Sequence, residues 1–208
     1  MADTITTLYL MRHGEVDAEY HRKFGGTIDM ELSPVGRHQA LMLGQFVKRF
    51  QFEALYASPM KRALATADPV AKEQGLNLKP VEGLREIDFG EWTGKTWMQV
   101  AEEYQINVFT WLDELDAGRV KDAELGADFL ARVGTATDEI VAAHPGQRVG
   151  VVCHGGVVRA MLAHLLDMPL KMWGKLDIEY ASVSRVEVCE RKQEVTLLNL
   201  APWRELAE

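Results

Sequence analysis

The sequence predicts an α/β fold: a three-layer α/β/α sandwich with a mostly parallel central sheet and a C-terminal antiparallel hairpin. Short apolar runs of strand length alternate with helical patterns along the chain, which is typical of a sheet covered by helices on both faces. Two of these runs, 6–11 and 148–153, are almost wholly apolar and are expected to form buried strands. The last two runs alternate apolar with polar residues, which favours a hairpin.

The first quarter of the chain is expected to contain one buried strand, a long loop and one helix. The strand at 6–11 leads into a charged loop that continues to residue 32. Ser33 is a good helix N-cap and Pro34 suits the first helical position, so we expect a helix from there to Phe50. Four residues are expected to supply much of its apolar face: Leu41, Leu43, Phe46 and Val47.

Two short strands and a second helix are expected next. One strand covers 54–57, the helix runs from about Lys61 to Glu73, and the other strand covers 76–81. Residues 84–94 hold two glycines and three acids, which is the composition of a functional loop.

The second half of the chain predicts helices, then the second buried strand, then the hairpin. Residues 95–143 have a helical pattern in two or three pieces, with breaks near Asn107 and Gly118. The strand at 148–153 follows, and a helix continues to about Leu166. The segments SVSRVEVCE and EVTLLNL form the hairpin, and three residues are expected in its turn: Arg191, Lys192 and Gln193.

Length and composition suit one domain over 1–208, with a helical cap at about 95–130. The apolar fraction of 47% and the charged fraction of 26% are those of a globular protein, and no apolar run is long enough to cross a bilayer. The N-terminal segment has no basic region of the kind that signal peptides carry, so a cytoplasmic protein is expected. Cys153 and Cys189 lie in strand patterns and are expected to be buried free thiols.

The formal net charge of −8 counts against nucleic-acid binding, because that function needs a basic surface. An acidic protein that binds an anionic substrate must therefore gather positive charge in its pocket. Arginine and histidine residues do occur where strands are expected to end.

Two histidines are expected to converge at the carboxyl edge of the sheet. The two most apolar strands end in Arg12-His13-Gly14 and in His154-Gly155-Gly156. In open α/β sheets, ligands bind beyond the carboxyl ends of the strands. The sequence therefore predicts a site there that contains both His13 and His154.

These residue types suit the transfer of a phosphoryl group. Arg12 can hold phosphate oxygens through two N–H groups, and Gly14 lets the backbone approach a ligand closely. His13 can offer an unprotonated ring nitrogen for in-line attack on phosphorus. Arg62, at the start of the second helix, is expected to face the phosphate, and His154 is expected to donate a hydrogen bond to a phosphoryl oxygen.

Such a reaction also needs a proton donor for the departing alcohol and an activated water, and one carboxylic acid can serve both steps. Glu86 is well placed in the 84–94 loop, and Asp88 and Glu91 remain alternatives on the residues alone. The sequence contains no motif with the ligand spacing of a metal site, so no metal or cofactor is expected.

Five segments, in order and spacing, resemble the histidine phosphatase (phosphoglycerate mutase-like) superfamily over nearly the whole chain: LYLMRHGEV, FGGTIDMELSPVGRHQA, YASPMKRALATA, LREIDFGEWTG and VVCHGGVVRA. The resemblance implies that His13 is the nucleophile that accepts the phosphoryl group and that Glu86 is the proton donor. It also implies that Arg12, Arg62 and His154 bind phosphate. The candidate phosphate- or substrate-binding residues are Arg12, Gly14, Gly25, Gly26, Arg62, His154 and Gly155.

Within this family, the chain resembles the short, phosphatase-type members, and its RHGEVD segment is partly similar to alpha-ribazole phosphatases. Mutases of the family are usually longer and carry paired arginines and a Pro-rich stretch, whereas 95–130 has neither adjacent arginines nor proline. The expected function is metal-independent hydrolysis of a small phosphorylated metabolite through a phosphohistidine. The alternatives are a phosphoglycerate mutase and a regulatory protein that binds phosphate esters with vestigial catalysis. A homodimer is left open.

The chain departs from the family pattern near the substrate. Val16 and Glu19 replace the usual Thr or Ser and the usual Asn, and glycines occupy 25–26 where the family has a hydrogen-bonding side chain. A carboxylate beside phosphate is repulsive, so Glu19 is expected either to turn outward or to pair with a cation. The candidate partners are Arg22, Lys23 and a cationic group on the substrate. Three aromatic residues of the cap are expected in the core rather than against substrate: Trp97, Phe109 and Trp111.

Overall fold

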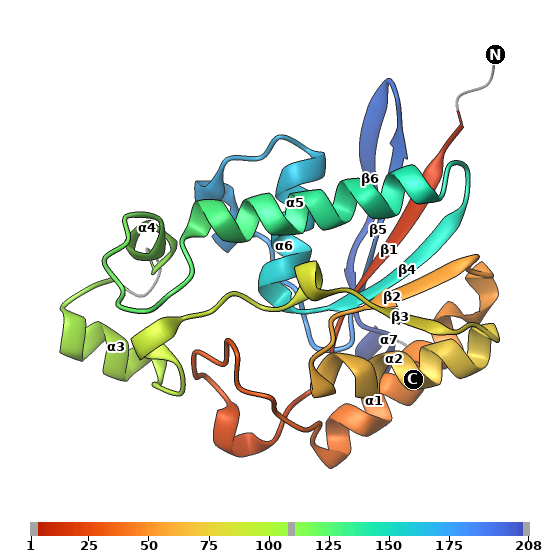
Figure 1. The fold of residues 1–208 in the computed structure, drawn as a ribbon. Helices are drawn as coiled ribbons and strands as arrows, with labels where there is room; N and C mark the ends of the chain where they lie inside the picture. Colours follow the sequence, from red (N-terminus) through yellow and green to blue (C-terminus); the bar gives the residue numbers. More distant parts are fainter. Residues whose placement is uncertain (1–3, 108–110, 206–208) are drawn as a thin grey trace.

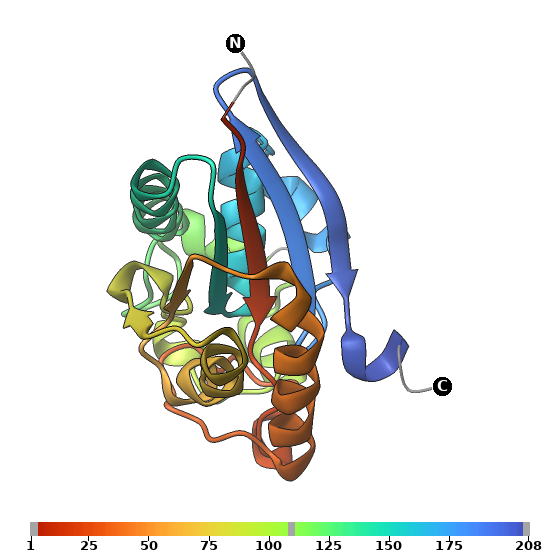
Figure 2. The same cartoon turned by 90° about the vertical axis from the view of Figure 1, so that its right-hand side faces the viewer.

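The computed structural model describes residues 4–107 and 111–205, and its strands form one mixed sheet in the order β3-β2-β4-β1-β5-β6. The first four strands in this order are parallel to one another, and β5 is antiparallel to both of its neighbours, β1 and β6. Figure 2 shows the β5–β6 hairpin along one edge and β3 at the other. The strands are β1 (Thr6–Arg12), β2 (Ala54–Ala57), β3 (Leu78–Pro80), β4 (Arg148–Cys153), β5 (Val183–Cys189) and β6 (Lys192–Leu200).

Helices cover both faces of the sheet, which confirms the predicted three-layer sandwich. In Figure 1, α5 and α6 lie on one side of the sheet, and α1 and α2 lie on the other. Successive residues of β1 point to opposite faces: Leu8 and Leu10 pack in the cluster with α5 and α6, whereas Tyr9 and Met11 pack in the cluster with α1 and α2. These four helices are α1 (Pro34–Val47), α2 (Lys61–Gln74), α5 (Gly126–Ala143) and α6 (Gly155–Leu165).

Helix α1 begins as predicted, but its apolar face differs from the prediction at one residue. Ser33 Oγ accepts a hydrogen bond of 2.9 Å from the Gly36 N–H, and Pro34 is the first helical residue. Leu41 is 54% exposed, so placing it on the apolar face was wrong. The buried stripe follows the i, i+3, i+4 spacing of one helical face, which Leu41 does not share. That stripe consists of Gly36, Gln39, Ala40, Leu43, Gly44, Phe46 and Val47.

The described part of the predicted helical region 95–143 contains three α-helices, and two of them lie together at one end of the molecule (Figure 1). They are α3 (Trp97–Tyr104) and α4 (Trp111–Asp116), and the third is α5. A capping box starts α3, in which Thr96 and Gln99 bond to each other's backbone N–H groups. The predicted break near Gly118 falls between α4 and α5. The other predicted break, near Asn107, adjoins a segment outside the described residues, and Phe109 lies within that segment.

The C-terminal hairpin forms as predicted, with a shorter turn. Lys192 and Gln193 were placed in the turn but belong to β6, which pairs them with Cys189 and Val188. Several short elements had no sequence prediction. They are α7 (Pro202–Glu205) and the 3-10 helices η1 (Ala18–Tyr20), η3 (Glu82–Leu84), η4 (Gly90–Trp92) and η6 (Leu170–Lys175). The helix predicted to continue to Phe50 ends as α1 at Val47, and its last three residues form the 3-10 helix η2 (Lys48–Phe50).

Both cysteines are free thiols, as expected, but only one of them is buried. Cys153 is fully buried in β4, and burial raises the pKa of its thiol, which keeps it protonated and inert. Cys189 is half-buried, because it ends β5 next to the exposed hairpin turn, and the prediction that it is buried was wrong. Within 4–107 and 111–205, no helix has both the length and the apolar character needed to span a membrane.

Candidate active site

The parallel register of β1 and β4 brings the two histidines to the same place. Arg12 is paired with Cys153, and the His13 N–H donates to the Cys153 carbonyl oxygen at 2.9 Å. The next residue on each strand is a histidine, so both leave the sheet side by side. Their ring centroids are 5.2 Å apart, which confirms the predicted convergence of His13 and His154.

A cavity of about 660 Å³ opens at this carboxyl edge of the sheet. Its charged lining residues are four cations and three acids, so the cavity has an excess of positive charge although the chain carries −8. Aromatic side chains form much of its wall. The cations are Arg12, Lys23, Arg62 and Arg159, the acids are Glu86, Asp113 and Asp177, and the aromatic residues are Phe24, Phe89, Trp97, Trp111, Trp173 and Tyr180.

His13 lines this cavity with one ring nitrogen committed to the backbone. Its Nδ1 lies 2.7 Å from the Gly14 carbonyl oxygen. A carbonyl only accepts hydrogen bonds, so Nδ1 carries the proton and Nε2 keeps its lone pair. Burial, with help from the charges of Arg62 and Arg12, lowers the pKa of His13 well below its ordinary value. The ring is therefore neutral, and the Nε2 lone pair is available at neutral pH.

His154 is completely buried and does not line the cavity. Arg62 Nε donates to its Nδ1 at 3.1 Å, so its Nε2 carries the proton and donates to Ser58 Oγ at 2.8 Å. Burial first, and then the charge of Arg62, lowers the pKa of His154, which keeps the ring neutral. Both ring nitrogens of His154 thus have protein partners here, Arg62 and Ser58, and the hydrogen bond to a phosphoryl oxygen stays a prediction. In this arrangement His154 orients Arg62.

Arg62 is 2% exposed and is oriented by three bonds. Besides the bond to His154, Nη1 donates to the Ile28 carbonyl at 2.7 Å and Nη2 to the Gly26 carbonyl at 3.1 Å. A guanidinium has five N–H groups, so two of them remain for a ligand once these bonds to described residues are made. The side chain comes from the first turn of α2, whose N-terminus adds to the positive potential.

Arg12 is held at the end of β1, and its Nε is a buried donor that points to no protein acceptor among the described residues. Its Nη1 donates to the Ile178 carbonyl at 2.6 Å, and its guanidinium carbon lies 3.9 Å from the centre of the Tyr180 ring. Its Nε is buried without a hydrogen-bond partner among the residues that the structure describes. A buried N–H that lacks a protein acceptor, at the wall of a cavity, suits an anionic ligand that supplies the acceptor.

Of the three candidate acids, Glu86 lines the cavity, and Asp88 and Glu91 do not. Asp88 Oδ1 accepts from the Gly90 N–H, and Glu91 Oε1 accepts from the Lys121 N–H, which commits both to the backbone. The structure therefore favours Glu86 among the alternatives that the residues alone left open.

Helix α6 holds the carboxylate of Glu86. The Gly156 N–H, in the first turn of α6, donates to Glu86 Oε2 at 3.2 Å. A Cβ on Gly156 would stand only 2.4 Å from Glu86 Oε1, so this position needs glycine for the carboxylate to lie there.

The other predicted glycines are divided between the cavity and the core. Gly25, Gly26 and Gly155 line the cavity, as expected of substrate-binding residues. Gly14 does not line it, and its N–H donates to Thr66 Oγ1 at 2.9 Å. A Cβ there would stand 2.5 Å from the Gly36 carbonyl oxygen, so Gly14 allows close packing against α1 rather than approach to a ligand.

Glu19 turns outward, as one of the two sequence interpretations required. It is exposed on η1, does not line the cavity, and bonds to Tyr20, whose pKa this bond raises. Val16 is buried and bridges to Leu32, so it shapes the loop rather than the cavity. Lys23 does line the cavity.

Sequence reasoning missed part of the cavity wall. Trp111 packs against the core as expected, but it also lines the cavity. Trp97 lines the cavity and is 44% exposed, so placing it in the core was wrong. Tyr180 comes from the segment before β5 and carried no sequence signal. Arg159 carried one: it lies four residues after Gly155, so on a helix it reaches back towards that helix's N-terminus.

Arg159 is the fourth cation of the cavity and is held at its base. Its Nε donates to the Leu176 carbonyl at 2.9 Å, and burial followed by the charge of Arg12 lowers its pKa. Across the described residues, no group of three or more His, Cys, Asp or Glu side chains is arranged to hold a metal ion.

Comparisons with known proteins agree with this geometry. The family model described as histidine phosphatase superfamily (branch 1) matches residues 8–201. Phosphoserine phosphatase 1 of Hydrogenobacter thermophilus is 31% identical over 193 residues, which are 93% of this chain and 92% of that protein. Glucosyl-3-phosphoglycerate phosphatase of Mycobacterium tuberculosis is 29% identical over 177 residues, 81% of this chain and 79% of that protein.

Solved structures show the same likeness. Bacillus stearothermophilus YhfR superposes with a TM-score of 0.83 at 32% identity, covering 92% of this chain and 96% of that one. A putative alpha-ribazole-5'-P phosphatase from Escherichia coli also gives 0.83, over 94% of this chain and 97% of that one. Its identity is 23%, so it shows a shared fold alone.

Proposed function

This chain belongs to the histidine phosphatase superfamily, branch 1, and is a phosphatase, and we propose that it hydrolyses small phosphomonoesters in two steps through a phosphohistidine at His13. The observation that carries the proposal is the His13 ring, whose Nδ1 is bonded to Gly14 while Nε2 is left free in a cavity that also holds Arg12 and Arg62.

In the first step, His13 Nε2 attacks phosphorus and the ester P–O bond breaks. Arg12 and Arg62 bind the phosphoryl oxygens through their free N–H groups and offset the charge that develops on them. Glu86 gives its proton to the departing oxygen, so that an alcohol leaves rather than an alkoxide. His154 acts through Arg62, because its Nδ1 fixes the direction of the guanidinium.

In the second step, water attacks the phosphohistidine. Glu86, now a carboxylate, takes a proton from the water while a new P–O bond forms and the N–P bond breaks. Phosphate leaves, and Nε2 regains its lone pair. The Gly156 N–H supports this step, because it donates a hydrogen bond to the ionised carboxylate.

We propose that the substrate carries a second acidic group close to its phosphate. Arg12 and Arg62 suffice for the phosphoryl group, and Arg159 adds a further cation to the cavity. One N–H of Arg159 donates to the Leu176 carbonyl, which leaves the other N–H groups of this partly desolvated guanidinium to bind a carboxylate of the substrate. Phosphoserine phosphatase 1 and glucosyl-3-phosphoglycerate phosphatase are named for esters that carry a carboxylate.

A panel of esters tests this function: p-nitrophenyl phosphate, phosphoserine, phosphoethanolamine, 3-phosphoglycerate and glycerol 3-phosphate. We expect the release of inorganic phosphate. Formation of the 2-isomer from 3-phosphoglycerate, without free phosphate, would instead establish a mutase. Binding of the esters without turnover would establish a regulatory protein with vestigial catalysis.

A further inference from the structure

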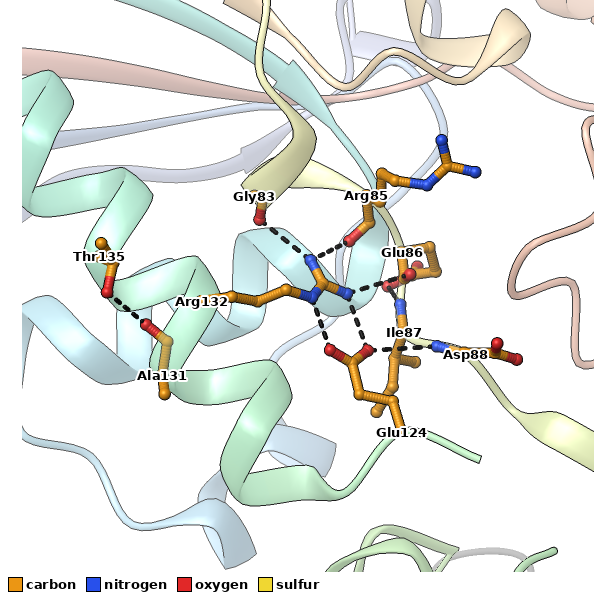
Figure 3. Close-up of polar contacts among 9 residues, drawn as sticks. All are labelled: Gly83, Arg85, Glu86, Ile87, Asp88, Glu124, Ala131, Arg132 and Thr135. Atoms are coloured by element: carbon orange, nitrogen blue, oxygen red, sulfur yellow. Dashed lines mark hydrogen bonds and ion pairs between the residues drawn. The ribbon is translucent and has the colours of Figure 1, made fainter. Parts of the chain in front are cut away.

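The loop that carries Glu86 is held by one arginine of α5, Arg132, which does not itself line the cavity. Figure 3 shows Arg132 with its guanidinium against the backbone of this loop. Nη1 donates to the carbonyl oxygens of Gly83 at 3.0 Å and of Arg85 at 2.8 Å, and Nη2 donates to that of Glu86 itself at 3.2 Å. One side chain thus bonds to three backbone carbonyls within four residues.

The carboxylate of Glu124 pairs with Arg132 and also bonds to the loop. Glu124 forms a bidentate pair with Arg132, with Nε–Oε1 at 2.6 Å and Nη2–Oε2 at 2.8 Å. Oε2 also accepts from the Asp88 N–H at 3.3 Å, and the Glu124 N–H donates to the Asp88 carbonyl at 2.9 Å (Figure 3 shows the first of these two bonds). The Arg132–Glu124 pair therefore bonds to the backbone on both sides of Glu86.

Every N–H group of the Arg132 guanidinium donates a hydrogen bond. A guanidinium has five N–H groups, one on Nε and two on each Nη, and the five bonds above engage all of them. The two side chains are 28% and 18% exposed, so water competes only weakly for these bonds. A lysine has three donors on a single atom and cannot bond to three carbonyls and a carboxylate in this planar arrangement.

We propose that Arg132, paired with Glu124, is a positioning residue for Glu86 that sets where its carboxyl group meets the departing oxygen. The inference rests on the proposed function of Glu86 as the proton donor. The loop backbone is fixed by Arg132 on one side, and the carboxylate is fixed by the Gly156 N–H on the other. A general acid must lie within hydrogen-bond reach of the oxygen that it protonates, so a shift of the loop lowers proton transfer first.

The test uses the leaving group to separate positioning from folding. An alkyl alcohol needs the proton from Glu86 when it departs, whereas p-nitrophenolate leaves as a stable anion. The value of kcat/KM reports the steps up to that departure. We expect Arg132→Lys to lower kcat/KM for the best alkyl monoester of the panel by about 100-fold, as a misplacement of about 1 Å does. The loss for p-nitrophenyl phosphate should be at least tenfold smaller.

Arg119→Lys is the matched control. Arg119 forms a similar fork with Glu114, at 2.6 and 2.9 Å, but neither of these bonds involves the 83–88 loop. The ratio of the two kcat/KM values should stay at its wild-type level in this variant. Glu124→Gln tests the pair from its other member, and keeps the inference testable if Arg132→Lys folds poorly. It should change the ratio in the same direction as Arg132→Lys.

The outcomes separate the two proposals. Equal losses for the alkyl and aryl esters in Arg132→Lys or in Glu124→Gln would overturn the positioning role, because a general loss of structure lowers both. A wild-type protein that releases phosphate from neither ester would instead overturn the proposed function. A changed ratio in the folded variants supports the role of Arg132.

Discussion

His13 Nδ1 donates a hydrogen bond to the carbonyl oxygen of Gly14, 2.7 Å away, within its own strand-to-loop turn. This contact fixes the tautomer of the ring and leaves Nε2 as the nitrogen that can form a bond to phosphorus. Burial and two neighbouring arginines keep the same ring uncharged, because they lower its pKa. The turn and the two arginines thus leave the ring neutral, with the Nε2 lone pair available to a ligand.

The free energy of unfolding should depend on pH through the two buried histidines, His13 and His154. Folding lowers the pKa values of His13 and His154 below 6.5, so the unfolded chain binds more protons than the folded one as the pH falls through 6.5. The free energy of unfolding should therefore decrease below that pH. His13→Asn should make its slope shallower by up to about 1.4 kcal/mol per pH unit in this window. Urea unfolding from pH 7.5 down to 5 measures the slope.

The control for that slope is the same substitution at His38, which is exposed on α1. Parallel stability curves for the wild type and His13→Asn would contradict the assignment of His13 as a buried neutral ring.

Glu86→Gln should remove the proton donor without removing bulk. We expect kcat/KM for the alkyl esters of the panel to fall by about 10²- to 10⁴-fold. The loss for p-nitrophenyl phosphate should be smaller, because its leaving group departs as an anion. Phosphoenzyme should accumulate with this substrate, since the glutamine cannot activate water. Equal losses for both kinds of ester would reassign the acid.

Gly156→Ala should displace the carboxylate of Glu86 by steric contact rather than by changing its chemistry. The new Cβ would stand 2.4 Å from Glu86 Oε1, and the flexible end of the glutamate can swing away, so the fold should persist. The lost hydrogen bond and the shifted carboxyl group should reproduce the leaving-group pattern of Glu86→Gln. Circular dichroism checks the fold, and kcat/KM for the two kinds of ester checks the pattern. An unchanged ratio would show that the contact with Gly156 does not position Glu86.

Arg159→Gln should lower kcat/KM for esters that carry a carboxylate more than for esters that lack one. A charged hydrogen bond contributes about 1.5–3 kcal/mol, which corresponds to a loss of about 10- to 100-fold for an ester that carries a carboxylate. Two pairs of the panel differ chiefly in that group: phosphoserine against phosphoethanolamine, and 3-phosphoglycerate against glycerol 3-phosphate. The measured quantity is the ratio of kcat/KM within each pair. If the ratio is the same in the variant and the wild type, Arg159 does not recognise the second acidic group.

The sequence predicts the sheet and the meeting of its two histidines because both depend on patterns along the chain. The apolar runs of β1 and β4 identify buried parallel strands, and parallel strands bring their carboxyl ends to one edge. His13 and His154 follow those strands directly, so their convergence needs no side-chain detail. The family resemblance then adds the roles.

Other features depend on contacts that no sequence pattern carries. Leu41 is a different case, because its position lies outside the i, i+3, i+4 spacing of the buried stripe of α1, and the helical period itself places it on the exposed face. His154 faces Arg62 and Ser58 rather than the cavity, and Gly14 packs against α1. Arg132 bonds to backbone carbonyls of the loop, which every residue has, so no residue type in the loop indicates these bonds.

We propose that His13 carries the phosphoryl group on Nε2, and the phosphoenzyme that accumulates in Glu86→Gln shows which atom holds it. The protein is incubated with p-nitrophenyl phosphate and quenched in alkali, where phosphohistidine survives. Peptide mass spectrometry and ³¹P NMR then locate the phosphoryl group. We predict one phosphoryl group on His13, bonded to Nε2, and none in His13→Ala. A phosphoryl group on another residue or on Nδ1, or rapid turnover of the ester by His13→Ala, would show that His13 Nε2 is not the nucleophile.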